Sequence, residues 1–128
     1  MKNNILSTLF VGIDVSSKTN VVCALDFYSN KLFETSSDNN LPGANEILEC
    51  IIKCLKENNL SNVIIALEST SVYSIHIANF LSSHELLMFF NPKVYCLNPK
   101  TTSNYRKSFT DLDKTDPLDA YLIADFAR

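Results

Sequence analysis

Hydrophobic and polar positions divide the first third of the chain into short, strand-like stretches. Residues 7–16 and 18–27 are apolar and rich in β-branched side chains, a short polar turn separates them, and residues 31–35 alternate between apolar and polar. Three such stretches joined by brief turns predict an antiparallel meander. Residues 36–43, which include a proline and a glycine, predict a polar connector.

The period of the pattern changes after this connector. Residues 44–57 carry apolar side chains at i, i+3 and i+4 spacing, with Glu and Lys on the opposite face, and this predicts an amphipathic helix. Residues 61–69 form a continuous apolar run that holds Glu68 near its end, which is typical of a strand buried on both faces of a partly parallel sheet. Residues 70–83 predict a second helix, with Tyr73 packed in the core.

The last third predicts one more strand and two helices. Residues 85–90 and 93–97 are both strand candidates, and we favour residues 94–97 as the fifth strand. A short helix is expected around residues 100–108, and a closing helix begins near Pro117.

The predicted order is therefore β-β-β-α-β-α-β-α, in one domain of 128 residues. Three antiparallel strands joined to two parallel ones, with helices on both faces, define an α/β fold class. The expected architecture is ribonuclease-H-like, a mixed five-stranded sheet flanked by helices.

Composition limits the function classes. Eleven basic residues against 14 acidic ones give a net charge of −3, which argues against a dedicated DNA-binding module. Nucleic-acid chemistry stays open, because bound divalent cations can offset several carboxylates. The two glycines of the chain are too few for a Gly-rich phosphate loop or a dinucleotide fingerprint.

Cysteine usage and hydropathy point to a cellular compartment. The four cysteines form no Cys-x-x-Cys pair, so buried free thiols of a reducing cytosol are expected. The sequence shows no signal peptide and no membrane span, and the expected location is the cytoplasm.

Four acidic residues form the candidate site. Asp14 interrupts the apolar first strand, where an ionised group needs a partner charge or a metal. Glu68 ends the buried run on the strand expected to lie beside the first, and ligands gather outside the carboxyl ends of such strands. Asp116 and Asp119 are three apart and share a helix face. If that helix packs at the same edge, four oxygen donors suited to Mg²⁺ or Mn²⁺ converge.

A structural interpretation of the last pair stands beside the metal site. With Pro117 at the first helical position, Asp116 lies at the N-cap and Asp119 at N3, close to a capping box. Taken alone, this stretch favours a cap. The cap accounts for neither Asp14 nor Glu68, and a capping carboxylate can also bind a metal.

The chain resembles a known family through an ordered set of motifs. "FVGIDVSSKTNVV", "ALESTSVYSIHIANFL", "VYCLNPK" and "DKTDPLDAYLIADFAR" are similar to the amino-terminal, RuvC-like catalytic domain of DEDD transposases, the insertion-sequence family one-hundred-and-ten. The resemblance extends from Leu9 to Arg128. Its most specific part is "KTD..DA" at residues 114–120, in register with "GID" and "LES".

The resemblance carries expectations about chemistry and partners. It places the acidic tetrad of the family on Asp14, Glu68, Asp116 and Asp119, and it implies bound Mg²⁺ and cleavage of DNA. It also implies a carboxy-terminal transposase domain with a nucleophilic serine outside this chain, a structured guide RNA, and a homo-oligomer in the full-length protein. No serine of this chain is therefore assigned as the strand-transfer nucleophile.

Five basic residues are candidates for contact with a nucleic-acid backbone. They are two lysines near the proposed acids and a small basic cluster around Tyr105: Lys18, Lys114, Lys100, Arg106 and Lys107. Solvated surface side chains are the alternative for all five.

The sequence as a whole predicts the catalytic domain of a transposase, which cleaves and transfers DNA strands with Mg²⁺ or Mn²⁺. Two alternatives stay open: a non-catalytic module for oligomerisation or RNA docking, and a Holliday-junction-type nuclease acting alone. A fragment of an actin-like sugar kinase, which also begins with a strand and "GID", is disfavoured because no glycines follow Asp14.

Overall fold

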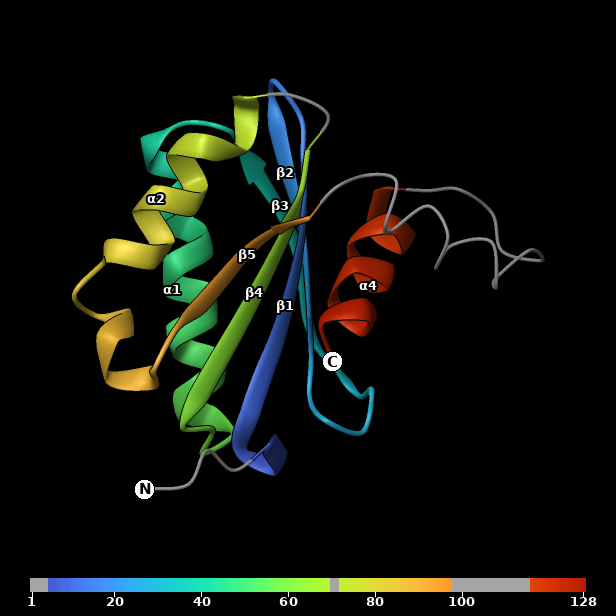
Figure 1. The fold of residues 1–128 in the computed structure, drawn as a ribbon, viewed down its shortest axis with the longest axis vertical. Coiled ribbons are helices and arrows are strands. Elements are labelled where there is room, and N and C mark those ends of the chain that lie inside the picture. The colour runs from blue at the N-terminus through green and yellow to red at the C-terminus, as the bar shows by residue number, and fades with distance from the viewer. Residues whose placement is uncertain (1–4, 70–71, 98–115) are drawn as a thin grey trace.

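A computed structural model of the protein describes residues 5–69, 72–97 and 116–128, with the side chains of residues 116–119 outside the described part. Its centre is a five-stranded sheet (Figure 1). The strands, in the spatial order β3-β2-β1-β4-β5, are β3 (Lys31–Asp38), β2 (Thr19–Leu25), β1 (Thr8–Val15), β4 (Asn62–Glu68) and β5 (Lys93–Leu97).

Strand directions match the predicted plan. β1 pairs with β2, and β2 with β3, in antiparallel fashion, whereas β4 runs parallel to both β1 and β5. The predicted ribonuclease-H-like sheet is thus confirmed, including the prediction that the strand bearing Glu68 lies beside the first strand. A short 3₁₀ turn, Ile5–Ser7, precedes β1.

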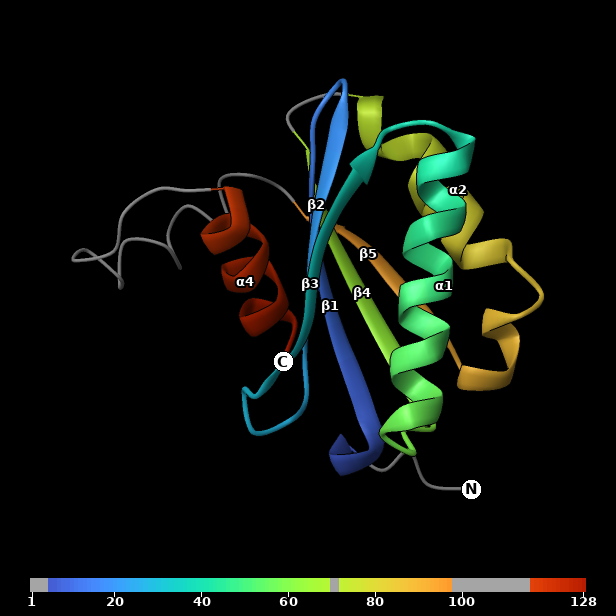
Figure 2. The ribbon, with the colours of Figure 1, turned by 180° about the vertical axis from the view of Figure 1, so that it is seen from behind.

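One face of the sheet is covered by α1 (Leu41–Glu57) and α2 (Ile75–Ser83), which follows a 3₁₀ turn at Val72–Ser74 (Figure 2). Strand alternation sends Leu9, Val11 and Ile13 of β1 toward these helices. Buried residues of α1, such as Ile47, Ile51 and Leu55, pack against them in the larger hydrophobic core.

The other face is covered by α4 (Asp116–Ala127), which packs on β1, β2 and β4. The described part of its core is smaller and includes Val21, Cys23 and Leu25 from β2 with Ala120 and Ala124 from the helix. Helices on both faces were predicted, and Figures 1 and 2 show α1 and α2 on one side of the sheet and α4 on the other.

Several element boundaries differ from the prediction. β3 extends to Asp38, so residues 36–38 belong to a strand and not to a connector. α1 begins at Leu41 because the Asn40 side chain caps it, accepting a hydrogen bond from the Gly43 amide at 2.8 Å. Residues 87–90 of the rejected strand candidate form a 3₁₀ turn, and the favoured fifth strand is confirmed.

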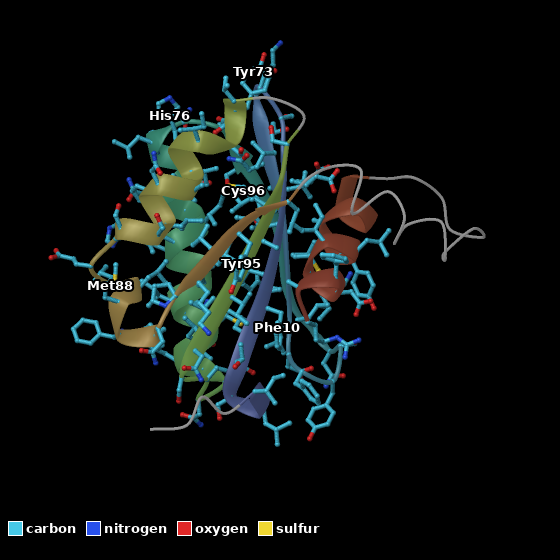
Figure 3. All side chains as sticks on the ribbon, in the orientation of Figure 1. Phe10, Tyr73, His76, Met88, Tyr95 and Cys96 are labelled. Carbon is cyan, nitrogen blue, oxygen red and sulfur yellow. The ribbon has the colours of Figure 1, made fainter. Side chains whose placement is uncertain are left out.

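Two predictions about individual side chains were wrong. Tyr73 was placed in the core, but it is 46% exposed because α2 proper begins only at Ile75 (Figure 3). Of the cysteines, Cys23 and Cys54 are buried as expected, whereas Cys96 on the edge strand β5 is exposed. The short helix predicted around residues 100–108 lies outside the described residues.

Within the described part of the chain, no helix combines the length and the apolar character needed to cross a membrane.

Candidate active site

Asp14 and Glu68 are direct neighbours at the carboxyl end of the sheet. They lie opposite each other in the parallel register of β1 and β4. Their preceding residues, Ile13 and Leu67, face the core under α1 and α2, so alternation directs both carboxylates to the face that α4 covers. Glu68 is only 7% exposed, and Asp14 is partly exposed.

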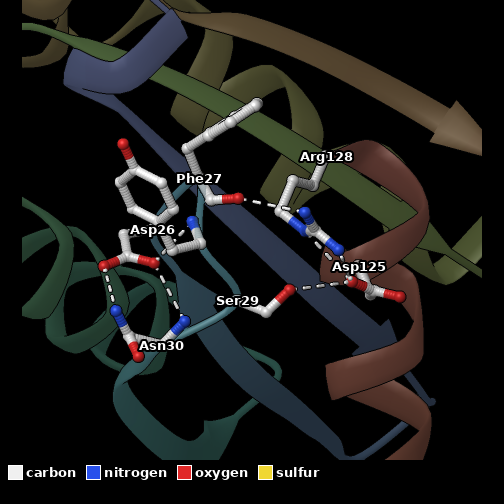
Figure 4. A network of polar contacts seen from close by, with 7 residues as sticks. Asp26, Phe27, Ser29, Asn30, Asp125 and Arg128 are labelled. Atoms are coloured by element: carbon white, nitrogen blue, oxygen red, sulfur yellow. Dashed lines mark hydrogen bonds and ion pairs between the residues drawn. The ribbon is translucent and has the colours of Figure 1, made fainter.

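The direction of α4 follows from contacts at its carboxyl end (Figure 4). The Arg128 guanidinium donates to the Phe27 carbonyl at 3.0 Å, and the Ser29 hydroxyl donates to the Asp125 carboxylate at 3.4 Å. Phe27 and Ser29 follow β2, whose end, Leu25, pairs with Phe10 near the start of β1. The helix therefore runs antiparallel to β1, and its amino terminus points to the end of the sheet that carries the two carboxylates.

Gly12 fixes how far along the strand the helix lies. A Cβ atom on Gly12 would collide with the Ala124 amide nitrogen and the Ala120 carbonyl oxygen, so the helix backbone rests directly on the strand. Asp14 lies two residues beyond Gly12, about 6.6 Å along a strand. Asp116 lies four residues before Ala120, about 6 Å along a helix. The backbone thus brings the first turn of α4 level with Asp14 and Glu68.

The structure leaves the role of the last pair of acids as a prediction. The backbone positions of Asp116 and Asp119 are described, but their side chains, and with them both the cap and the metal interpretation, are not. Among the described residues, no group of three or more His, Cys, Asp or Glu side chains could hold a metal ion. Of the predicted tetrad, only Asp14 and Glu68 have described side chains.

The predicted basic contacts are mostly outside the described residues. Lys18 lies in the β1–β2 turn, beyond the end of β1, and is exposed. The other four, Lys100, Arg106, Lys107 and Lys114, belong to the segment that the structure does not describe.

Sequence reasoning missed two features at this end of the sheet. One is Asn39, whose side chain bonds to the segments that follow β1 and β4. The other is a groove of about 540 Å³ on the α1–α2 side, lined by Asn39, Leu41, Tyr73, His76 and Phe80 among others. Asn39 was missed because an asparagine in a polar connector is typical of a turn. The groove was missed because its residues come together only in the folded chain.

Comparison with known proteins identifies the family. The model of the DEDD transposase family of IS110 elements, described as "Transposase", matches residues 11–128. The chain belongs to this transposase family. A search of curated proteins found no match.

Two solved structures with Holliday junction DNA are similar to this transposase-family chain. T. thermophilus RuvC in complex with a Holliday junction substrate matches with a TM-score of 0.58 and 10% identity, over 91% of this chain and 90% of that one. Fowlpox virus resolvase in complex with Holliday junction DNA matches with a TM-score of 0.46 and 15% identity, over 93% of each chain. The RuvC similarity extends over nearly the whole of both chains and identifies the fold as RuvC-like.

A third similar structure is much longer than this chain. Marinitoga piezophila Argonaute with 5′ OH guide RNA and target DNA matches with a TM-score of 0.47 and 21% identity. The match includes 65% of this transposase-family chain and 16% of the Argonaute chain.

The donor chemistry at the site fits a hard divalent cation. Asp14 and Glu68 supply carboxylate oxygens side by side, and Glu68 is nearly buried, where a negative charge benefits most from a neighbouring positive one. Both remaining members of the predicted set, Asp116 and Asp119, are also carboxylates. Oxygen donors without His or Cys suit Mg²⁺ or Mn²⁺ and not zinc.

Proposed function

We propose that this chain is the catalytic domain of a DNA transposase, which cleaves phosphodiester bonds and transfers DNA strands with a divalent metal. The observation that carries the proposal is the juxtaposition of Asp14 and Glu68 on the face to which α4 brings the backbone of Asp116 and Asp119. Membership in the transposase family supports the substrate class.

In this proposal the four acids hold Mg²⁺ or Mn²⁺ at the carboxyl end of β1 and β4. When bound, such ions activate a water or hydroxyl and stabilise the leaving oxygen of a phosphodiester. Asp14 and Glu68 come from adjacent central strands, so their backbone spacing is fixed by the sheet. Asp116 and Asp119 come from α4, so their position depends on how that helix docks.

The basic residues bind the DNA backbone in this proposal. Lys18 is exposed at the same end of the sheet, and the remaining four lie between β5 and α4 in the sequence. Their charge offsets the acidic balance of the chain where phosphate approaches.

The resemblance to the family supports a larger working unit. We propose that residues 1–128 act together with a carboxy-terminal transposase domain that supplies the nucleophilic serine, with a structured guide RNA, and as a homo-oligomer in the cytoplasm. Ser16, Ser69 and Ser71 then have no nucleophilic role, although each lies within three residues of Asp14 or Glu68 in the sequence.

Titration with Mn²⁺ tests the metal site directly. We expect saturable binding by the wild-type chain, followed by calorimetry or by Mn²⁺ electron paramagnetic resonance. Asp14→Asn and Glu68→Gln should each weaken it at least tenfold, because each removes a ligand charge. Glu46→Gln, an exposed acid on α1, is the matched control and should bind like wild type.

The same titration separates the alternatives. Absence of Mn²⁺ binding, or binding that survives in Asp14→Asn, would favour a non-catalytic module for oligomerisation or RNA docking. A Holliday-junction nuclease acting alone is the second candidate, since the RuvC match includes 90% of that chain. Robust junction cleavage by residues 1–128 alone would support it, whereas we expect weak DNA affinity and little turnover.

A further inference from the structure

Asn39 connects four segments of the chain through its hydrogen bonds. It lies directly after β3, and its amide nitrogen Nδ2 donates to the Ser16 carbonyl at 2.8 Å and to the Tyr73 carbonyl at 3.2 Å. Its backbone N–H donates to the Lys18 carbonyl at 2.8 Å. Its side-chain oxygen accepts a hydrogen bond from Nδ2 of Asn20 on β2 at 3.3 Å.

The two carbonyls belong to the segments that leave the candidate site. Ser16 is two residues after Asp14, at the start of the β1–β2 turn. Tyr73 is five residues after Glu68, in the 3₁₀ turn before α2. The Asn39 side chain therefore bonds to the segments that follow β1 and β4, the two strands that carry the acids. Figure 3 shows Tyr73 at this end of the molecule.

Asn20 orients Asn39 at a cost in stability. Asn20 is 1% exposed, and within the described part of the chain its Oδ1 atom has no hydrogen-bond partner. Its neighbour in the β2–β3 register, Ser37, has a buried hydroxyl that also lacks a partner there. Buried polar atoms without partners are destabilising, and apolar side chains of similar shape would avoid this cost.

A cost of this kind needs an explanation in the native structure. A buried polar side chain without a full set of partners is accounted for when its hydrogen bond orients a residue beside a functional site. Within the described residues, the Asn20 side chain makes its hydrogen bond to Asn39, and Asn39 in turn bonds to the two segments that follow Asp14 and Glu68.

We propose that Asn39, oriented by Asn20, is a positioning residue that holds the segments following Asp14 and Glu68 in place, and with them the orientation of the two carboxylates for metal binding. A primary amide suits this role because it donates two hydrogen bonds while its oxygen accepts a third. In this role Asn39 acts through the segments that follow Asp14 and Glu68 and not as a ligand of the metal. The inference rests on the proposed metal site.

Two substitutions of Asn39 test its hydrogen bonds: one removes only the bonds that its side chain donates, and the other removes the whole side chain. Asn39→Asp keeps the size and the acceptor for Asn20, but it cannot donate to Ser16 or Tyr73. Asn39→Ala removes all three side-chain bonds. We expect both to weaken Mn²⁺ binding by about threefold to tenfold, since partners beyond the ligands commonly tune metal affinity. The added charge of Asn39→Asp attracts cations, so a loss in that variant cannot be electrostatic.

Asn30→Ala is the matched control. Asn30 also donates through its side-chain amide, to Asp26 at 2.9 Å, but it lies in the β2–β3 turn at the opposite end of β2. Amide hydrogen exchange gives a readout that does not need metal. Asn39→Ala should exchange faster in residues 14–19 and in residues 72–76, whereas Asn30→Ala should leave both segments unchanged.

The outcomes distinguish this inference from the proposed function. Wild-type Mn²⁺ affinity in both Asn39 variants, or unchanged exchange in the two segments, overturns the positioning role and leaves the metal site standing. Absence of Mn²⁺ binding by the wild-type chain overturns both. Weaker binding in both variants, with faster exchange and with an unaffected Asn30→Ala control, supports the inference.

Discussion

Gly12 is the residue on which the position of α4 depends most. A Cβ atom there would lie 2.9 Å from the Ala124 Cα atom and closer still to two other helix backbone atoms, which cannot rotate away as a side chain can. We expect Gly12→Ala to destabilise the fold by about 1–3 kcal/mol, the usual cost of overpacking. Urea unfolding measures it. If the free energy of unfolding stays at the wild-type value, the helix does not rest on this glycine.

Gly12→Ala also tests the site, because any shift of α4 moves the backbone of Asp116 and Asp119. A variant that still folds should bind Mn²⁺ more weakly than wild type, even though no predicted ligand has changed. Wild-type affinity together with a lower free energy of unfolding would show that the helix position does not matter to the metal.

At the level of residues, sequence predicts chemistry better than it predicts packing. Asp14 and Glu68 were identified because a charge in an apolar run needs a reason, and they do lie side by side. Tyr73 was misplaced, since its helical spacing from Ile77 has no meaning outside the helix. Asn39 was not found, because its role depends on contacts between segments that only folding brings together.

At the level of elements, the carboxyl end of α4 carries a partly buried ion pair that also bonds to the β2–β3 turn (Figure 4). Asp125, whose side chain is 9% exposed, accepts from Arg128 at 2.8 Å, and Arg128 also donates to the Phe27 carbonyl. Arg128→Ala removes these bonds and leaves a nearly buried carboxylate. We expect a loss of about 1.5–3 kcal/mol in urea unfolding, typical of hydrogen bonds to charged groups.

Lys31→Ala is the matched control for this pair. It breaks the 3.3 Å salt bridge between Lys31 and Glu34, whose side chains are 50% and 33% exposed, respectively. Because water screens these charges, the loss of unfolding free energy should stay within about 1 kcal/mol. Equal losses in the two variants would contradict the view that the Asp125–Arg128 pair anchors α4.

Element types followed from periodicity, but boundaries did not. β3 continues through Ser36 and Ser37 because β2 offers backbone partners up to Asp38, which no local pattern reveals. α1 gains a first turn from the Asn40 cap, where the sequence pattern showed only polar residues and a proline. Tertiary pairing decided the first boundary and side-chain capping the second.

At the scale of the whole molecule, the sheet separates two cores of unequal size. The core under α1 and α2 includes residues of β1, β2, β4 and both helices, whereas among the described residues the core under α4 has five buried members. Smaller buried apolar area gives a smaller free energy of local opening. The helix that carries half of the predicted metal ligands is thus the element we expect to open first.

Two cysteines report on the two cores separately. Cys23 lies in the core under α4 and Cys54 in the larger core. Burial raises the pKa of each thiol to about 11, so at pH 8 both are neutral in the folded protein and react only after an opening that restores the thiolate. In a Cys50→Ser, Cys96→Ser background, we expect a thiol reagent under native conditions to label Cys23 at least tenfold faster than Cys54. Arg128→Ala should widen that ratio by loosening α4 alone, and equal labelling rates for the two thiols would mean that the whole molecule opens as one unit.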